Sequence, residues 1–162
     1  MHTFVVDSSS TTRLAKKVFV VDSSSTTRAV KKIWVIDSGG TPRLVFQSAS
    51  VLTMVAGSSG NDRGFLHGAF GSISPTTLLT GQTVTELITT VSGTVTFAAN
   101  FTSNPGSTFL TSIHVAGPSS NFTVLGSAAS FAFGAGTGTW SFPSGGVAQI
   151  SGDTYTVTIT TD

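Results

Sequence analysis

The sequence predicts an all-β protein, in which a fibrous or β-meander arm of strand-and-turn repeats precedes a β-sandwich or jelly-roll (immunoglobulin-like) domain. Three observations predict this class. Ser and Thr account for 51 of the 162 residues while only 15 residues are charged, and Thr together with Val and Phe favours strands over helices. A tandem repeat of period 15 opens the chain. The remainder alternates apolar and hydroxyl residues between Gly-, Pro-, Ser- and Asn-containing turns.

The repeat begins at Phe4. Residues 4–17 (FVVDSSSTTRLAKK) and 19–32 (FVVDSSSTTRAVKK) are identical at twelve of fourteen positions, and a looser third copy follows at 34–45 (WVIDSGGTPRLV). Self-similarity at a fixed period indicates one structural unit per repeat. We therefore define an arm over residues 1–46, with repeats 4–18, 19–33 and 34–46.

Each repeat predicts a strand closed by a five-residue polar turn. The segments 16–22 (KKVFVVD) and 31–37 (KKIWVID) are rich in β-branched and aromatic residues, and the Ser/Thr-rich stretches between them are suited to turns. Because side chains alternate along a strand, these segments are apolar on both faces. A small meander cannot cover both faces, so we expect further copies of the chain to cover them, in a homo-oligomer.

The 15-residue period of strand, turn and strand resembles the triple β-spiral shaft of viral fibres, although the Ser/Thr loop is longer than that family's tight Gly or Pro turn. Units such as KKIWVIDSGGTPRLVF also resemble the short repeats of small structural proteins of tailed bacteriophages. These resemblances cover about 45 residues. They imply three interlocked chains followed by a head domain.

The arm is basic. Its seven Lys and Arg residues against three Asp give +4, so the other 116 residues sum to −3 to reach the net charge of +1. One interpretation is a basic arm that binds nucleic acid or an acidic protein surface. The other is that edge lysines prevent strand aggregation and Arg pairs with Asp between repeats. The candidate assembly residues are Phe4, Phe19, Trp34, Lys16, Lys17, Lys31 and Lys32.

Residues 47–70 are predicted to form a Gly-rich linker, in which SVLTMVA (50–56) is either a short strand or an anchor on a neighbour. Residues 71–162 are predicted to form the sandwich, whose candidate strands are 83–91, 94–101, 108–116, 122–126, 130–134, 139–143, 147–151 and 154–162. The expected core is Val84, Leu87, Val95, Phe97, Leu110, Ile113, Val115, Phe122, Val124, Phe131, Phe133, Trp140, Phe142, Val147, Ile150, Tyr155, Val157 and Ile159.

No chemistry-bearing motif stands out. The chain has one Glu, three His and no Cys, without spacings typical of paired carboxylates, a nucleophile elbow or metal ligands. We expect no enzymatic activity, no metal and no cofactor. Trp140 is interpreted either as a core residue packed beside Phe142 or as a ligand contact that stacks on a sugar.

These observations lead to a functional hypothesis. We expect a non-enzymatic, trimeric fibre- or spike-like component of a tailed-phage virion, anchored by its repeats with the sandwich facing outward. The alternatives are a trimeric capsid decoration protein and a glycan- or receptor-binding module. The expected partners are the chain itself and other virion proteins, with nucleic acid disfavoured. No signal-peptide pattern or membrane-spanning run is seen, so we expect synthesis in the bacterial cytoplasm and residence in the virion.

Overall fold

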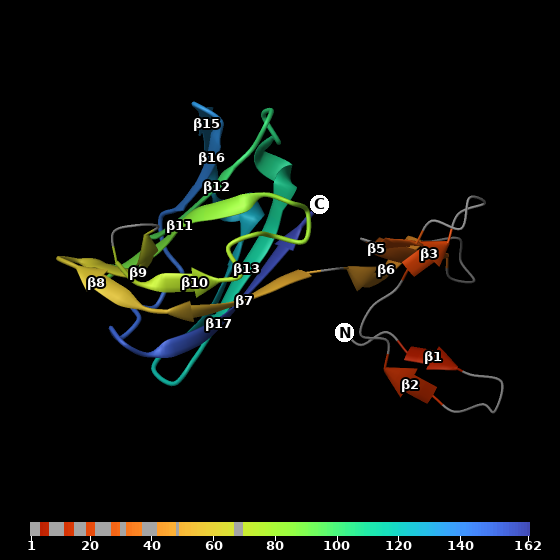
Figure 1. Cartoon of the computed structure of the whole chain (residues 1–162), viewed down its shortest axis with the longest axis horizontal. Helices are drawn as coiled ribbons and strands as arrows, with labels where there is room; N and C mark the ends of the chain where they lie inside the picture. Colours follow the sequence, from red (N-terminus) through yellow and green to blue (C-terminus); the bar gives the residue numbers. More distant parts are fainter. Residues whose placement is uncertain are drawn as a thin grey trace. The chain divides into compact units, whose positions relative to one another are not determined.

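The computed structural model describes residues 4–6, 12–14, 19–21, 27–29, 32–36, 42–47, 49–66 and 70–162. The chain divides into two compact units, Met1–Ser48 and Ala49–Asp162 (Figure 1). The described residues are nearly all β, and the only helical segments among them are two short 3-10 turns, η1 (Ser107–Phe109) and η2 (Gly126–Ala128).

The described residues of the first unit form three antiparallel strand pairs, each a separate two-stranded sheet. In the first two, Phe4 lies opposite Leu14 and Phe19 lies opposite Ala29, and in the third an irregularity falls between Ile33 and Trp34. The pairs are β1 (Phe4–Val6) with β2 (Thr12–Leu14), β3 (Phe19–Val21) with β4 (Thr27–Ala29), and β5 (Lys32–Ile36) with β6 (Pro42–Gln47). One repeat thus supplies two short strands, where the sequence led us to expect one longer strand.

The second unit is a β-sandwich of two antiparallel sheets over one core. The five-stranded sheet has the order β10 (Ser72–Ser74), β7 (Ala49–Val55), β17 (Thr154–Thr161), β13 (Leu110–Ala116), β14 (Asn121–Leu125). The six-stranded sheet has the order β15 (Ser130–Gly134), β16 (Thr137–Phe142), β12 (Val95–Asn100), β11 (Thr83–Thr90), β9 (Asp62–Leu66), β8 (Gly57–Ser59).

The predicted linker over 47–70 is corrected by the structure. β7, β8 and β9 all fall in this range, and β7 pairs with β17 along its whole length while Leu52 and Met54 enter the core. Two glycines of this range, Gly57 and Gly64, mark close backbone contacts: a Cβ on Gly57 would lie 2.4 Å from the backbone nitrogen of Gly71. The glycine content that predicts a linker here permits tight packing between backbone segments.

The predicted strand over 147–151 is also wrong. This segment has no strand structure, and the expected core residues Val147 and Ile150 are 44% and 58% exposed. The buried residue is Gln149, whose Nε2 donates to Thr89 Oγ1 at 3.2 Å and to the Val147 carbonyl oxygen at 2.8 Å. Side-chain hydrogen bonds therefore fix this loop in place of a strand ladder.

The core confirms most of the predicted residues. Fourteen of the eighteen are buried, and Trp140, Phe97 and Tyr155 are the largest side chains among them. Apart from the two loop residues, the exceptions are Phe131 and Phe133 on β15, which are only partly buried. β15 is an edge strand, so its side chains meet the core from one side only.

Candidate functional site

The predicted assembly residues of the arm are not brought together in the described structure. Phe4, Phe19, Trp34 and Lys32 lie on strands β1, β3 and β5, which belong to three different sheets. Lys16, Lys17 and Lys31 lie outside the described residues. The role of this set in assembly stays a prediction.

Trp140 belongs to the core. Its side chain is 0% exposed and its indole Nε1 donates to the Ser107 carbonyl oxygen at 3.1 Å. Four aromatic rings surround it with centroids 4.7 to 5.9 Å away, namely Phe131, Phe97, Phe109 and Phe101. A ring without exposed surface cannot stack on a sugar, so the alternative of a ligand contact at Trp140 is not retained.

The outer face of the five-stranded sheet is rich in hydroxyl groups. Along β17, Tyr155, Val157 and Ile159 are buried, so the intervening threonines point away from the core. Their cross-strand neighbours extend the pattern, because Thr156 lies opposite Thr53, and Thr158 lies between Val51 and His114. We call this surface the hydroxyl face, defined by Val51, Thr53, Val55, Ser112, His114, Thr123, Leu125, Thr154, Thr156, Thr158 and Thr160.

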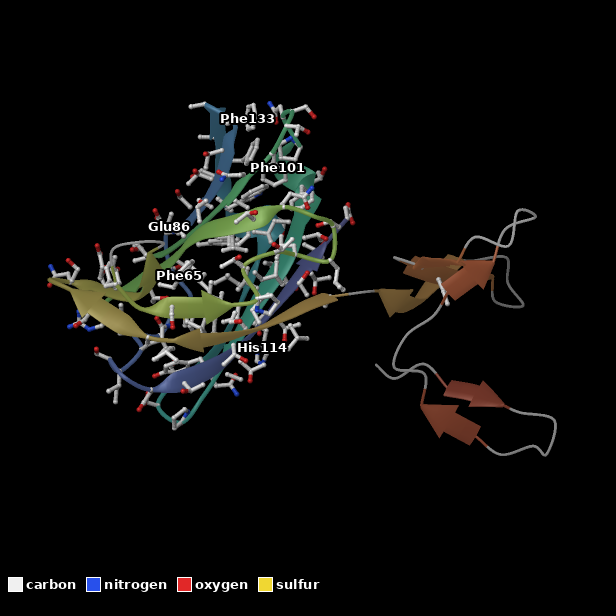
Figure 2. All side chains as sticks on the ribbon, in the orientation of Figure 1. Phe65, Glu86, Phe101, His114 and Phe133 are labelled. Carbon is white, nitrogen blue, oxygen red and sulfur yellow. The ribbon has the colours of Figure 1, made fainter. Side chains whose placement is uncertain are left out.

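The hydroxyl face carries exposed apolar groups but no carboxylate, Lys or Arg among its defining residues. Val51 is 61% exposed and Leu125 is 56% exposed. Its single titratable side chain is His114 (Figure 2), whose Nδ1 lies 2.9 Å from Thr123 Oγ1 on the neighbouring strand β14. Valine and threonine side chains of this kind pack closely without the desolvation cost of a charge.

The acidic residues lie elsewhere. Glu86 on β11 belongs to the six-stranded sheet (Figure 2), and burial, followed by the nearby negative charge of Asp62, raises its pKa above the ordinary value of 4.5. Asp153 accepts a hydrogen bond from Ser119 Oγ at 2.9 Å, and Ser119 Oγ also contacts the Tyr155 hydroxyl. The Tyr155 hydroxyl in turn accepts the Ile150 N–H at 2.9 Å. This second group ties two loops to β17, which is a structural role.

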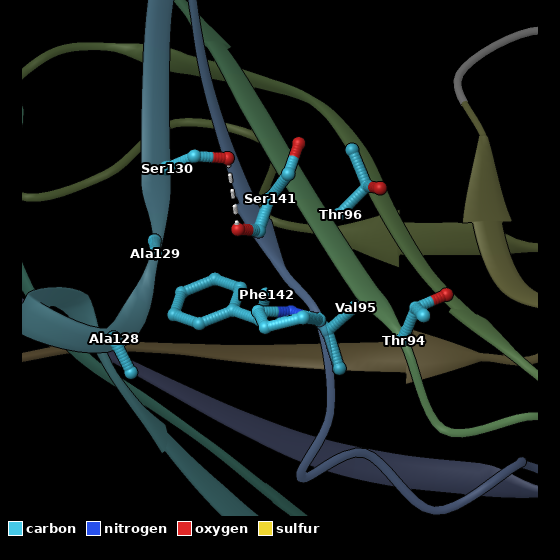
Figure 3. Close-up of a pocket in the computed structure, with 9 residues that line it drawn as sticks. Thr94, Val95, Thr96, Ala128, Ala129, Ser130, Ser141 and Phe142 are labelled. Carbon is cyan, nitrogen blue, oxygen red and sulfur yellow. Dashed lines mark hydrogen bonds between the residues drawn. The ribbon is translucent and has the colours of Figure 1, made fainter.

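A groove of about 570 Å³ lies beside β15 (Figure 3). Its lining combines small hydroxyl side chains with a buried apolar floor, and Ser130 Oγ donates to the Ser141 carbonyl oxygen at 3.3 Å. The lining residues are Thr94, Val95, Thr96, Ala128, Ala129, Ser130, Ser141, Phe142 and Pro143, and none of them is titratable. The groove offers shape and hydroxyl groups but no acid, base or activated nucleophile.

Within the described residues, no three His, Cys, Asp or Glu side chains gather in a way that could hold a metal ion. The same part of the chain contains no helix that is both long and apolar enough to cross a membrane. No family model, no curated protein and no solved structure matches the chain.

Only part of the hydroxyl face could be predicted from the sequence. The alternation in TYTVTITT predicted the outward threonines of β17 correctly. It did not predict that Val51 and Val55 share their face with Leu125, because the position of β7 beside β17 is set by a pairing between strands distant in sequence.

Proposed function

We propose that this chain is a non-enzymatic structural subunit of a tailed-phage particle. In this proposal three copies interlock through the repeat arm, and the sandwich, an immunoglobulin-like or jelly-roll head, faces outward. The observation that carries the proposal is the hydroxyl face, a sheet surface with exposed Val51, Val55 and Leu125 and no Asp, Glu, Lys or Arg among its defining residues.

The first step concerns hydration. A typical soluble domain is about one quarter charged, whereas the described part of the second unit carries Asp62, Arg63, Glu86, Asp153 and Asp162. None of these five belongs to the hydroxyl face. Exposed apolar groups that gather on one uncharged surface mark contacts with other proteins. An uncharged surface with exposed apolar side chains is expected of a subunit that is permanently packed in an assembly.

The second step concerns the arm. Isolated two-stranded hairpins are marginally stable in water, and a repeated hairpin with apolar residues on both faces gains stability from neighbouring chains. A closed ring of three chains would cover these faces. The resemblance of the repeats to fibre shafts and to phage structural proteins favours the same arrangement.

The third step concerns chemistry. The described side chains supply no metal-binding group of three, and the groove beside β15 has no titratable lining residue. Catalysis by acid, base or nucleophile needs such groups at close range. A structural function makes no such demand.

The proposal predicts a trimer that depends on the arm. Light scattering on the full chain should give a mass of three times 16.5 kDa, or a multiple of that mass. The chain that begins at Ala49 should no longer form a trimer. A full-length chain that stays at 16.5 kDa at micromolar concentration would contradict the trimer.

Placement in a particle is tested separately. Tagged full-length chain expressed during phage infection should co-sediment with intact particles, whereas the chain that begins at Ala49 should stay in the supernatant. Val51→Lys, on the hydroxyl face, should lower incorporation, and Val91→Lys is the matched control because Val91 is 55% exposed but lies outside that face. Equal incorporation of all four chains would exclude both the arm and the face as assembly elements.

A further inference from the structure

The free edge of β15 suggests a second kind of contact. An edge strand presents unpaired backbone N–H and C=O groups, and proteins protect such edges with charge, proline, bulges or short strands. Of the four edge strands in the second unit, β8 and β10 have three residues each, and β10 is followed by Pro75. β14 and β15 have five residues each and contain no charge and no proline.

β15 differs from β14 in what it leaves uncovered. The inward side chains of β14, Phe122 and Val124, are buried, whereas the inward side chains of β15, Phe131 and Phe133, are only partly buried. Figure 2 shows Phe133 at the end of β15. On the inward side of the sheet, an added strand beside β15 would cover apolar surface that the sandwich leaves partly exposed, whereas the inward side chains of β14 are already buried.

The hydrogen-bonding register of β15 follows from its hairpin. Gly134 and Thr137 flank a two-residue turn whose residues Ala135 and Gly136 have φ of 49° and 77°, as in a type I′ turn. The flanking pair of such a turn is hydrogen-bonded, and paired and unpaired residues then alternate along the ladder. The backbone groups of Ser130, Ala132 and Gly134 therefore point toward β16, and those of Phe131 and Phe133 point to the free edge.

The sequence of β15, Ser-Phe-Ala-Phe-Gly, is self-complementary about Ala132. We propose that β15 pairs antiparallel with β15 of a second copy of this chain, across a twofold axis at Ala132. In this register Phe131 lies opposite Phe133 of the partner subunit, and the two symmetric pairs exchange four backbone hydrogen bonds. The opposed phenylalanines form favourable cross-strand aromatic pairs. The two six-stranded sheets become one continuous sheet, in the isologous manner of a C2 dimer.

The side chain at position 132 decides whether this pairing can form. Ala132 is exposed and lies on the outer side of the sheet, opposite Thr139. At the proposed axis the two copies of residue 132 form a non-hydrogen-bonded pair, with Cα atoms about 4.5 Å apart. This distance lies within the range that a disulfide can bridge.

Cysteine substitution tests the geometry directly, because the natural chain contains no cysteine. We expect full-length Ala132→Cys, under mild oxidation at micromolar concentration, to run mainly at twice 16.5 kDa on a non-reducing denaturing gel. Val91→Cys is the matched control, since Val91 is 55% exposed and lies outside both the hydroxyl face and the β15 edge. The Ala132→Cys dimer should form at least about tenfold faster, because paired thiols have a high effective concentration. Equal rates for the two variants would overturn the proposal.

Charge substitution tests the same contact without a covalent bond. Ala132→Lys places two positive charges opposite each other and should abolish the twofold contact, as should Ala132→Glu, whereas an equimolar mixture of the two should restore it. Sedimentation velocity measures all three samples. The proposal fails if Ala132→Lys associates as strongly as the natural chain, or if mixing restores nothing.

The twofold contact and the proposed arm-mediated trimer are separable. Removal of residues 1–48 leaves β15 intact, and Ala132→Lys leaves the arm intact. If the chain that begins at Ala49 still dimerises through position 132, the pairing of β15 edges is supported independently of the arm. If Ala132→Lys leaves a stable trimer, the arm-mediated trimer is supported independently of the β15 edge.

Discussion

At the residue scale, Trp140 is the centre of an aromatic cluster that stabilises the core of the second unit. The second unit contains no disulfide and depends on large buried rings, and Trp140 contacts four phenylalanines from three other segments of the chain. Sequence alternation predicted that Trp140 and Phe142 share a face. It did not place Phe101 and Phe109 in the core, because Phe101 follows the end of β12 and Phe109 lies in η1, where the alternation of a strand does not apply.

We expect Trp140→Ala to lower the free energy of unfolding by about 3–5 kcal/mol, the usual cost of removing a large aromatic side chain from a core. Urea denaturation followed by circular dichroism measures this change. Leu79→Ala is the control, because Leu79 is 70% exposed and exposed substitutions change stability by roughly 0.5 kcal/mol or less. Equal midpoints for the two variants would show that Trp140 is not a core residue.

Glu86 supplies a pH dependence. Its pKa is raised in the folded state by burial and by the negative charge of Asp62, so the folded chain binds a proton more tightly than the unfolded chain. The unfavourable contribution of the charged carboxylate is present above the raised pKa and is relieved as the pH falls through it toward 4.5.

We therefore expect Glu86→Gln to stabilise the fold more at about pH 7 than at about pH 4.5 relative to the natural chain. Asp62→Asn should produce part of the same effect, because it removes the second cause of the shift. Urea midpoints at both pH values measure the difference. A Glu86→Gln chain whose advantage is the same at both pH values would contradict the raised pKa.

At the scale of elements, strands with clean alternation were predicted well and glycine-rich strands were not. β11, β12, β13 and β17 follow the expected ranges closely. β8 and β9 were missed because glycine, serine and charged residues interrupt the period of two, and their pairing depends on contacts distant in sequence. The opposite error, a strand predicted at 147–151, arose because the polar Gln149 between Ala148 and Ile150 resembles an outward position of an alternating strand. In the structure Gln149 is buried.

Truncation distinguishes the observed second unit, Ala49–Asp162, from the predicted domain over residues 71–162. The chain that begins at Ala49 should fold cooperatively, because it retains β7 with Leu52 and Met54. The chain that begins at Gly71, the start of the expected domain, should not fold, since β17 then loses the strand that pairs with it over seven residues. Thermal denaturation by circular dichroism compares them. A cooperative transition in the shorter chain would restore the linker interpretation.

At the scale of the whole molecule, the two kinds of proposed contact use different physics. The hydroxyl face offers a flat surface of threonine and valine, on which association is non-directional and driven by burial. The edge of β15 offers backbone hydrogen bonds, which fix direction and register. The sequence could not predict which strands form the hydroxyl face or which strand lies at an edge, because both depend on the order of strands in each sheet.

The way the chain enters its second unit has a mechanical consequence. Residue 49 is the first residue of β7, a strand with β17 on one flank and β10 on the other. Any tension that reaches residue 49 is received first by the ladder with β17, which pairs with all seven residues of β7, and β10 adds a second ladder at Thr53–Val55. The second unit can therefore be held through its N-terminal end without the load falling on an outermost strand of the sheet.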